Sequence, residues 1–396
     1  MAEWKEMMVG DLCDTISDTY HRNDAEVVLV NTSDVLEGKI LNHQAVENKN
    51  LKGQFKKTFR KDDILYSEIR PANKRYAYVD FEETDCYIAS TKLMVLRPKI
   101  DKVLPRFLFA FLSSNHVLME LQHLAETRSG TFPQITFSSE LAPMPITVPD
   151  FKTQEKIVCL LSSIEGKIQN NSTINENLLQ QSEAIYKAWF CGHSSLNKSS
   201  PWQKTTIGEL TSLVVRGITP KYNDDSNQLV INQKCIRNHI VDLTPARRHL
   251  PKAITEKWLI KGDLLINSTG EGTLGRVAQV WFSPNNLTVD SHVTIVRPKS
   301  AELSNYIGLW GLTHEAEIES LHTGSTGQTE LPRERVKAME LPLPDETTLS
   351  RFNELITPMT QAIVKNQQEN IHLAELRDSL LPQLISGKLD VSDLDI

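Results

Sequence analysis

The chain has 396 residues, of which 43 are Lys or Arg and 50 are Asp or Glu, giving a formal net charge of -7 at pH 7. This length allows two or more domains with separate cores, and the acidic balance argues against binding nucleic acid through overall positive charge. The five cysteines form no Cys-x-x-Cys pair, so neither a disulfide framework nor a zinc site is indicated.

The sequence gives no sign of a targeting or membrane-spanning segment. Its first residues are acidic and lack the apolar stretch of a signal peptide, and the longest apolar run, 107–112, is too short to cross a bilayer. We therefore expect a cytoplasmic protein.

Residues 1–150 are predicted to form a first mixed domain of strands and helices. Alternating apolar runs at 64–69, 75–81 and 92–98 are typical of strands and are bounded by Gly, Pro and Asn. A helical stretch at 105–126 follows, and then come a short polar loop and a Pro-rich exit.

Residues 151–200 are predicted to hold a long amphipathic helix, from Thr153 to Phe190, and a linker. Apolar residues recur along it at alternating steps of three and four. The seam is interrupted by Asn171 and Asn175, after which the apolar pattern resumes.

Residues 201–345 repeat the first domain. Trp202 opens a Trp-x4-Ile-Gly-acid-Leu stretch that matches the one opened by Trp4, and residues 262–299 align with 62–99 up to the same closing Arg-Pro-Lys. An internal repeat of this length indicates two copies of one unit. We expect the second copy to have the same order of strands, helix, polar loop and Pro-rich exit.

Residues 346–396 are predicted to form a second long helix and a tail. Pro358 either starts this helix or kinks it, and Pro382 ends it. Asn366 and Asn370 occupy the positions on its seam that the two asparagines occupy on the first helix.

An antiparallel pairing of the long helices places Asn171 and Asn175 opposite Asn370 and Asn366. Facing buried amides satisfy one another, whereas a slipped register sets an amide against Leu or Ile. We therefore predict an α+β fold of two tandem α/β domains, each followed by a long helix, with the helices packed as an antiparallel coiled coil with pseudo-twofold symmetry. The alternative is two independent surface helices whose asparagines face water.

Three kinds of segment carry a family resemblance. They are the two Trp-led starts, the segments 145–168 and 262–278, and, most specifically, 375–391. Over essentially its full length the chain resembles the specificity subunits of Type I restriction-modification systems. The resemblance implies two target-recognition domains, each reading one half of a bipartite, asymmetric DNA sequence, with helices that separate them and dock methyltransferase subunits, two of them by the pseudo-twofold symmetry. Translocating restriction subunits complete the implied assembly.

The same resemblance implies no catalytic residue and no cofactor in this chain, while S-adenosylmethionine, ATP and magnesium belong to its partners. The sequence itself is consistent with this implication, because it contains no Asn-Pro-Pro-aromatic motif of the kind found in DNA methyltransferases. Segment 270–276 has the glycine spacing of a phosphate-binding loop, but Arg276 stands where Lys is required, so a turn between strands is favoured. A different class of function stays open, a coiled-coil adaptor that binds proteins and no DNA.

DNA contacts are expected from local patches, because no whole domain of the chain has a net positive charge. Segment 49–61 carries six Lys or Arg and no acid, which favours phosphate binding, although a solvated charged loop is the alternative. The predicted DNA-contacting residues of the first domain are Lys56, Lys57, Arg60, Arg70, Asn73, Lys74, Arg75, Arg128, Thr131 and Gln134.

The second domain has a cluster of Asn, Gln and Arg at 231–239, residue types that can bond base edges; plain surface is the alternative. The equivalent polar loops, 127–134 and 323–330, either approach DNA or turn the chain. They differ in sequence, as expected for domains that read different half-sites. The predicted DNA-contacting residues of this domain are Asn232, Gln233, Arg237, Asn238, Arg247, Arg248, Ser268, Thr269, Arg276, Thr326 and Gln328.

Overall fold

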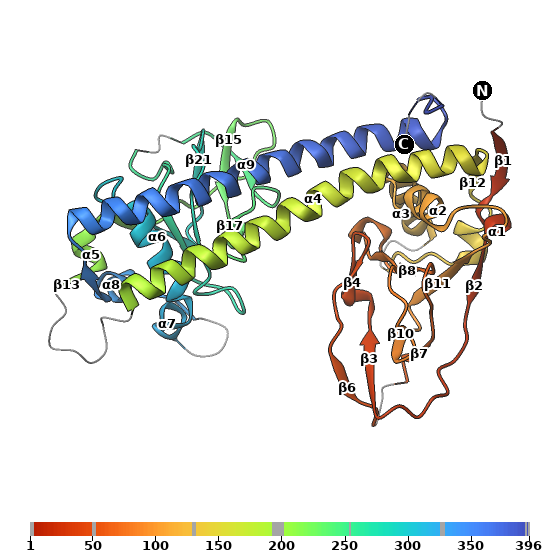
Figure 1. The fold of residues 1–396 in the computed structure, drawn as a ribbon, viewed down its shortest axis with the longest axis horizontal. Coiled ribbons are helices and arrows are strands. Elements are labelled where there is room, and N and C mark those ends of the chain that lie inside the picture. Colours follow the sequence, from red (N-terminus) through yellow and green to blue (C-terminus); the bar gives the residue numbers. More distant parts are fainter. Residues whose placement is uncertain are drawn as a thin grey trace. The chain divides into compact units, whose positions relative to one another are not determined.

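The structure, a computed structural model, describes residues 4–49, 53–128, 132–191, 202–252, 255–324, 329–392 and 394. The chain divides into two compact units, of which unit 1 comprises residues 1–169 and 370–396 and unit 2 comprises residues 170–369. Each unit therefore holds one mixed domain together with part of both long helices, α4 (Phe151–Tyr186) and α9 (Glu346–Ile385) (Figure 1).

Unit 1 contains two four-stranded sheets. The first has the order β2-β11-β8-β9 with antiparallel neighbours, and the second has the order β6-β3-β10-β7, in which β3 and β10 are parallel. The strands are β2 Cys13–Ile16, β3 Glu26–Val30, β6 Ala45–Glu47, β7 Phe55–Lys57, β8 Ile64–Ser67, β9 Tyr76–Tyr78, β10 Tyr87–Ser90 and β11 Leu93–Pro98.

Short elements complete the mixed domain of unit 1. Strands β1 and β12 pair antiparallel, and β4 and β5 form a small hairpin. These elements and the helices are β1 Lys5–Met8, α1 Val9–Leu12, β4 Val35–Leu36, β5 Lys39–Ile40, α2 Pro105–Leu112, α3 Asn115–Arg128 and β12 Pro145–Val148. Buried residues of the first sheet, α2 and α3 share one core with Ile157 and Leu161 of α4 and Leu384 of α9, so the helix pair is part of the unit's interior.

Unit 2 repeats this topology. Its larger sheet has the order β14-β22-β19-β20, and β15 lies parallel to β21 as β3 lies parallel to β10. The elements are β13 Gln203–Thr206, α5 Ile207–Leu210, β14 Thr211–Arg216, β15 Gln228–Ile231, β16 Ile236–Arg237, β17 Ile240–Val241, β18 Arg247–His249, β19 Leu264–Asn267, β20 Val277–Gln279, β21 Leu287–Val289, β22 Val293–Pro298, α6 Ser304–Thr313, α7 Glu315–Ser320, α8 Arg333–Lys337 and β23 Glu340–Leu343. The duplication predicted from the sequence is therefore present in the sheets.

A buried ion pair explains the shared Arg-Pro-Lys closings. Asp63, 1% exposed, accepts from Arg97 Nε at 2.8 Å and Nη2 at 2.7 Å. Asp263, 0% exposed, accepts from the same two atoms of Arg297, both at 2.8 Å. Each carboxylate also accepts a backbone N–H three residues upstream, at 2.9 Å. Identical bidentate pairs thus fix β11 and β22, the strands that come last along the chain in the sheets β2-β11-β8-β9 and β14-β22-β19-β20.

The two long helices begin at equivalent caps. Helix α4 spans Phe151–Tyr186 and continues as a π-helical turn, Lys187–Cys191, and α9 spans Glu346–Ile385. Asp150 Oδ1 accepts from Thr153 N, and Asp345 Oδ1 accepts from Thr348 N, both at 2.9 Å. Each Pro-Asp pair is therefore a helix start.

Helix α9 corrects two predictions about its prolines. It begins twelve residues before Pro358 and runs past Pro382, so Pro358 does not start the helix and Pro382 does not end it. A proline lacks only its own N–H and disturbs one turn. Ile356, Ile363 and Leu384 are at most 1% exposed, and their burial offsets that disturbance.

The helices run antiparallel within each unit. In unit 2, Asn366 Nδ2 donates to Asn175 Oδ1 at 2.9 Å, and Ser182 Oγ contacts Met359 Sδ at 3.3 Å. In unit 1, Lys156 Nζ donates to Ser392 O just beyond α9. Residue numbers thus rise along one helix as they fall along the other.

The four seam asparagines make different bonds. Asn171 and Asn175 are 1% and 5% exposed, and Asn175 pairs with Asn366 as expected from the sequence. Asn171 donates to Glu369 at 2.8 Å, whereas Asn370, in unit 1, donates to the carbonyl of Ile168 at 3.3 Å. Their role in fixing the register stays a prediction.

The helix predicted at 105–126 is two helices. Ser114 is buried and its Oγ accepts from Val117 N at 3.4 Å, which starts α3 and separates it from α2. The matching stretch at 303–322 also divides into two helices, α6 and α7, at His314. No helix among the described residues is both long and apolar enough to span a membrane.

Candidate DNA interface

Three loops meet in each unit through the same backbone hydrogen bonds. In unit 1, Glu68 N donates to Lys92 O at 3.1 Å, and Ile135 N donates to Glu68 O at 2.9 Å. In unit 2, Ser268 N donates to His292 O, and Leu331 N donates to Ser268 O, both at 2.8 Å. We call residues 68–70, 90–92 and 133–135 loop cluster 1, and residues 268–270, 290–292 and 330–331 loop cluster 2.

One exposed side chain stands at the same position in both clusters. Lys92 N donates to Ser90 Oγ at 3.3 Å, and His292 N donates to Asp290 Oδ1 at 2.9 Å. The same short turn, two residues after a polar acceptor, therefore precedes β11 and β22. Both Lys92 and His292 are exposed.

Loop cluster 1 places a cation beside a carboxylate. Lys92 Nζ lies 3.5 Å from Glu68 Oε2, and 23% of the Glu68 side chain is exposed. Lys57 lies nearby, donates its Nζ to Leu93 O at 2.8 Å, and has its pKa lowered by burial, with Lys92 adding to the shift and Glu68 opposing it. Lys57 is therefore half-buried beneath the cluster rather than displayed with Lys56.

Loop cluster 2 holds a chain of hydrogen bonds between side chains. Gln233 Nε2 donates to Thr269 Oγ1 at 2.8 Å, and Thr269 Oγ1 lies 2.7 Å from His292 Nδ1. Gly270 makes room for this arrangement, because its φ is +102° and a Cβ there would lie 2.7 Å from Gln233 Nε2. Gln233 and Thr269, both predicted to contact DNA, are thus brought together with His292.

Two other predicted residues belong to loop cluster 1. Arg70 is exposed and its N donates to Pro133 O at 3.1 Å, and Gln134 pairs with Ile69. Asn73 is exposed and its N donates to Arg70 O at 2.8 Å, which joins it to the cluster. Lys56 and Arg60 are also exposed.

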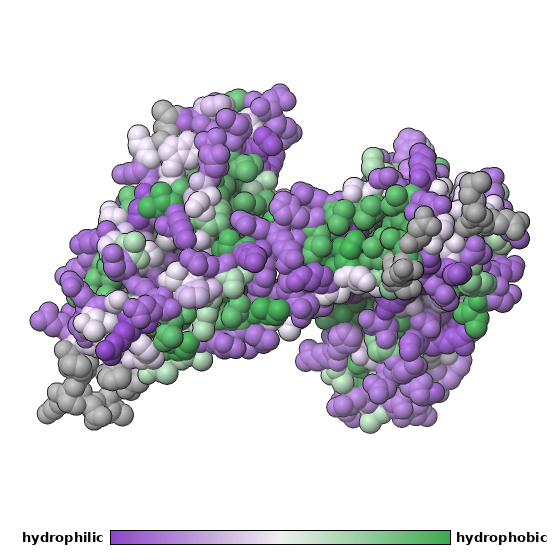
Figure 2. All heavy atoms as spheres, turned by 45° about the horizontal axis from the view of Figure 1, so that its top comes forward, coloured by the Kyte–Doolittle hydropathy of each residue, from purple (hydrophilic) through white to green (hydrophobic). Residues whose placement is uncertain are grey.

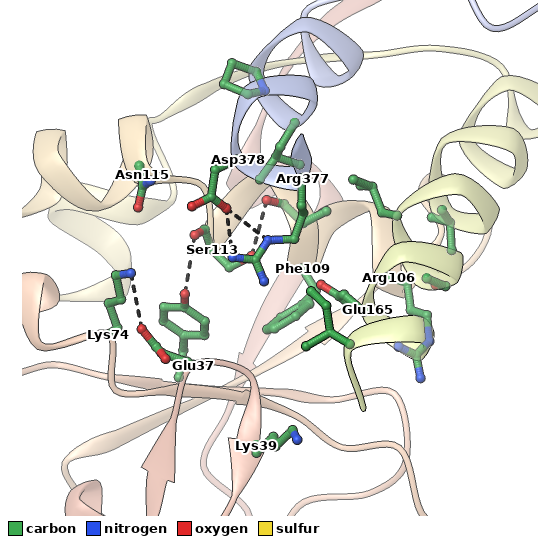
Figure 3. A pocket seen from close by; sticks show the side chains of 18 residues that line it. Glu37, Lys39, Lys74, Arg106, Phe109, Ser113, Asn115, Glu165, Arg377 and Asp378 are labelled. Carbon is green, nitrogen blue, oxygen red and sulfur yellow. Dashed lines mark hydrogen bonds and ion pairs between the residues drawn. The ribbon is translucent and has the colours of Figure 1, made fainter. Parts of the chain in front are cut away.

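Three predicted residues of unit 1 have partners within the fold. Lys74 Nζ lies 3.2 Å from Glu37, in a cavity of about 320 Å³ beside α2, α4 and α9 (Figure 3). Arg75 donates to Ser33 O at 2.9 Å, and Arg128 donates to Glu140 at 3.1 Å. DNA binding by these side chains would compete with those contacts.

A second grouping in unit 2 surrounds the β16–β17 hairpin. Arg237, Asn238 and Arg276 line one hollow with His239 and Glu315, so three predicted residues lie together there. Arg276 donates to Gly272 O at 2.7 Å. The glycine-rich segment itself is a turn between β19 and β20, as predicted.

His239 connects the hairpin to helix α4. Its Nδ1 lies 3.0 Å from Glu183 Oε1, and its Nε2 lies 3.4 Å from Glu315 Oε2. Burial lowers the pKa of His239, but its hydrogen bonds to Glu183 and Glu315 outweigh burial and raise the pKa to about 9. The ring is therefore an imidazolium at neutral pH, held between two carboxylates.

The remaining predicted residues of unit 2 are dispersed. Asn232 caps a short 3₁₀ turn by accepting from Lys234 N at 2.9 Å, and Arg248 donates to Ser226 O. Arg247 is exposed and its guanidinium lies 3.4 Å from the centroid of the Tyr222 ring.

The structure corrects the prediction at Ser268. This side chain is 0% exposed and its hydroxyl is bonded to Thr294, because it points into the larger sheet of unit 2, so it is not available to DNA. The predicted residues Thr131, Thr326 and Gln328 lie outside the described residues.

Lys92 and His292 were not among the predicted contacts. Each is a single residue just before an apolar strand, and composition alone does not mark it. The signal lies in the repeat alignment, where Ser-Thr-Lys-Leu of one copy matches Asp-Ser-His-Val of the other at the start of a shared strand.

Among the described residues, no group of three or more His, Cys, Asp or Glu is placed to hold a metal ion.

Comparisons with known proteins agree on one family. A family model described as Type I restriction modification DNA specificity domain matches residues 1–180 and 199–372. The Type I restriction enzyme HindI specificity subunit of Haemophilus influenzae is 27% identical over 475 positions, covering 98% of this chain and 100% of that protein. The MjaIX specificity subunit of Methanocaldococcus jannaschii is 23% identical over 300 positions, covering 69% and 67%.

A solved structure supports the fold. The S subunit of a Type I restriction-modification system from M. genitalium is 14% identical, and the match covers 99% of this chain and 97% of that one with a TM-score of 0.53.

Proposed function

The chain belongs to the family of Type I restriction-modification DNA specificity domains, and we propose that it reads a bipartite, asymmetric DNA sequence, one half-site with each mixed domain. It is the non-catalytic, DNA-recognition subunit of such a system. Its contribution is to select the sequence on which partner subunits act.

One observation carries this proposal. The two units share the strand order of one four-stranded sheet, an ion pair and loop connections. They nevertheless display different polar side chains at equivalent positions, Lys92 in one and His292 in the other. Phosphate contacts alone do not require such a difference, whereas reading two unlike half-sites does.

The proposed partners are double-stranded DNA, two methyltransferase subunits and restriction subunits with translocase activity. S-adenosylmethionine, ATP and magnesium would be bound by those partners. The long helices offer docking positions, since Ile174, Leu355, Ile371 and Leu376 are 39%, 45%, 58% and 45% exposed. Figure 2 shows hydrophobic patches at the surface between hydrophilic residues, which suits association with other proteins.

The test is to co-express the chain with a cognate methyltransferase subunit and map methylated bases across the host genome. We expect one bipartite motif with a fixed gap. A stable complex that methylates no such motif would contradict the proposal and favour a protein-binding adaptor. Affinity of the complex for DNA should also fall steeply with salt.

A further inference from the structure

We propose that Lys92 and His292 are the specificity-determining residues of loop clusters 1 and 2, each bonding the edge of a base in one half-site. This inference rests on the proposed function and assigns that function to particular atoms.

The first support is positional equivalence. Both residues follow the same side-chain-capped turn, and the carbonyl of each accepts from the residue in the β8–β9 or β19–β20 turn that also bonds the third loop. The backbone at this position is thus fixed in the same way twice. At this position the side chain differs, Lys92 in one unit and His292 in the other. This is the arrangement expected where the same backbone scaffold presents different side chains to different DNA sequences.

The second support is the orientation of the His292 ring. Thr269 Oγ1 accepts from Gln233 Nε2 and lies 2.7 Å from His292 Nδ1, which fixes the direction of the ring. No described residue bonds to the other ring nitrogen, Nε2, so this nitrogen is the one presented to a base edge. With a hydrogen on Nε2 it would donate to purine N7 or guanine O6.

The third support is the chemistry around Lys92. Lys92 is a donor and Glu68, 3.5 Å away, is an acceptor. A guanine–cytosine pair offers the complementary groups in the major groove, acceptors on guanine and an amino donor on cytosine. A phosphate would be repelled by the Glu68 carboxylate, so this pair favours a base edge over the backbone.

The decisive experiment compares methylated motifs of the wild-type complex with those of His292→Ala and Lys92→Ala, each in the full chain with its methyltransferase partner. We expect each variant to lose preference at one or two positions of a single half-site, by about tenfold per position, and to leave the other half-site and the gap unchanged. Thr269→Val keeps the ring but removes its positioning bond, so it should relax the same positions as His292→Ala, to a smaller degree.

Matched controls are His322→Ala and Lys102→Ala, exposed residues of the same types outside the clusters. They should leave the motif unchanged. Should a variant fail to assemble, His292→Asn and Lys92→Gln replace it, because they keep a side-chain donor of different reach and should shift the preferred base.

Two results would overturn the inference while leaving the proposed function intact. One is a wild-type bipartite motif that none of these variants alters. The other is equal weakening at all sequences with a salt slope reduced by about one, the behaviour of a phosphate contact. Absence of any wild-type motif would instead remove the proposed function, and the inference with it.

Discussion

Unit 1 and unit 2 have the same framework and different surfaces. The framework positions, such as Asp63 with Arg97 and Asp263 with Arg297, are identical in residue type and agree in distance to 0.1 Å. The hairpin tips and loop clusters have diverged: Gly38 faces Phe109, whereas His239 at the equivalent turn bonds two glutamates. The comparison teaches that folding constraints and recognition constraints act on separate residues here.

The largest expected effect tests the shared framework. Asp63→Ala and Asp263→Ala each leave an arginine without its carboxylate and expose a backbone N–H, so each should destabilise its own unit by about 3–5 kcal/mol. Chemical denaturation, followed by a probe in each unit, measures the loss. The exposed Asp225→Ala serves as control, and a loss in only one unit would show that the frameworks are not equivalent.

The next effect distinguishes the units by pH. The pKa of His239 is raised from its ordinary value of 6.5 to about 9, so its stabilisation of unit 2 is full below about pH 6.5 and is lost as pH rises through 9. The backbone at His239 is left-handed, with a φ of 62°, and asparagine tolerates this conformation. His239→Asn should therefore lower the stability of unit 2 by about 2 kcal/mol at pH 6 and much less at pH 10. A loss that does not change with pH would contradict the imidazolium assignment.

A third prediction concerns the helix seam. Asn366→Leu leaves the buried Oδ1 of Asn175 without its donor, while Asn175 Nδ2 keeps its bond to Ile363 O, and the variant should cost about 1–2 kcal/mol. The double variant Asn175→Leu, Asn366→Leu removes both polar groups and should recover that loss or exceed wild-type stability. Thermal melts of the three variants form a cycle with wild type. A double variant less stable than Asn366→Leu would show that the seam does not tolerate apolar residues, against the register model.

The smallest expected effect concerns the hollow of unit 2. Arg237→Ala removes an exposed cation and should relax one half-site, at about 1 kcal/mol per affected base. Arg128→Ala should act on the other half-site, and more weakly, because Glu140 already holds that side chain. Motif mapping checks both, and symmetric loss at both halves would contradict the assignment of one reader per unit.

Much of the fold could be predicted because its signals are local. The strand predicted at 92–98 agrees with β11, Leu93–Pro98, to within one residue, and the repeat located both long helices. The break at Ser114 was missed because the apolar periodicity continues through it. The prediction that Pro382 ends the second long helix was wrong, because burial of neighbouring residues outweighs the local effect of a proline. Such tertiary effects leave no mark in a short window of sequence.

The site was harder to predict for a related reason. Arg75, Asn232 and Ser268 have the right residue types for DNA, but their side chains bond backbone carbonyls, cap a turn or lie buried. Composition cannot separate these uses from display at the surface. Lys92 and His292 became recognisable only when the hydrogen bonds of the two units were compared.

The division of the chain also sets the order in which the two units can fold during synthesis. Unit 2 is one continuous segment, 170–369, whereas unit 1 needs both ends of the chain. Leu384 and Val391 belong to the unit 1 core, and Gly387 packs against the indole of Trp4. On the ribosome, unit 2 has all its residues first, and the domain translated earliest waits for the last residues to close its core. A nascent chain that stops before about residue 385 therefore contains a complete unit 2 and a unit 1 whose core is incomplete.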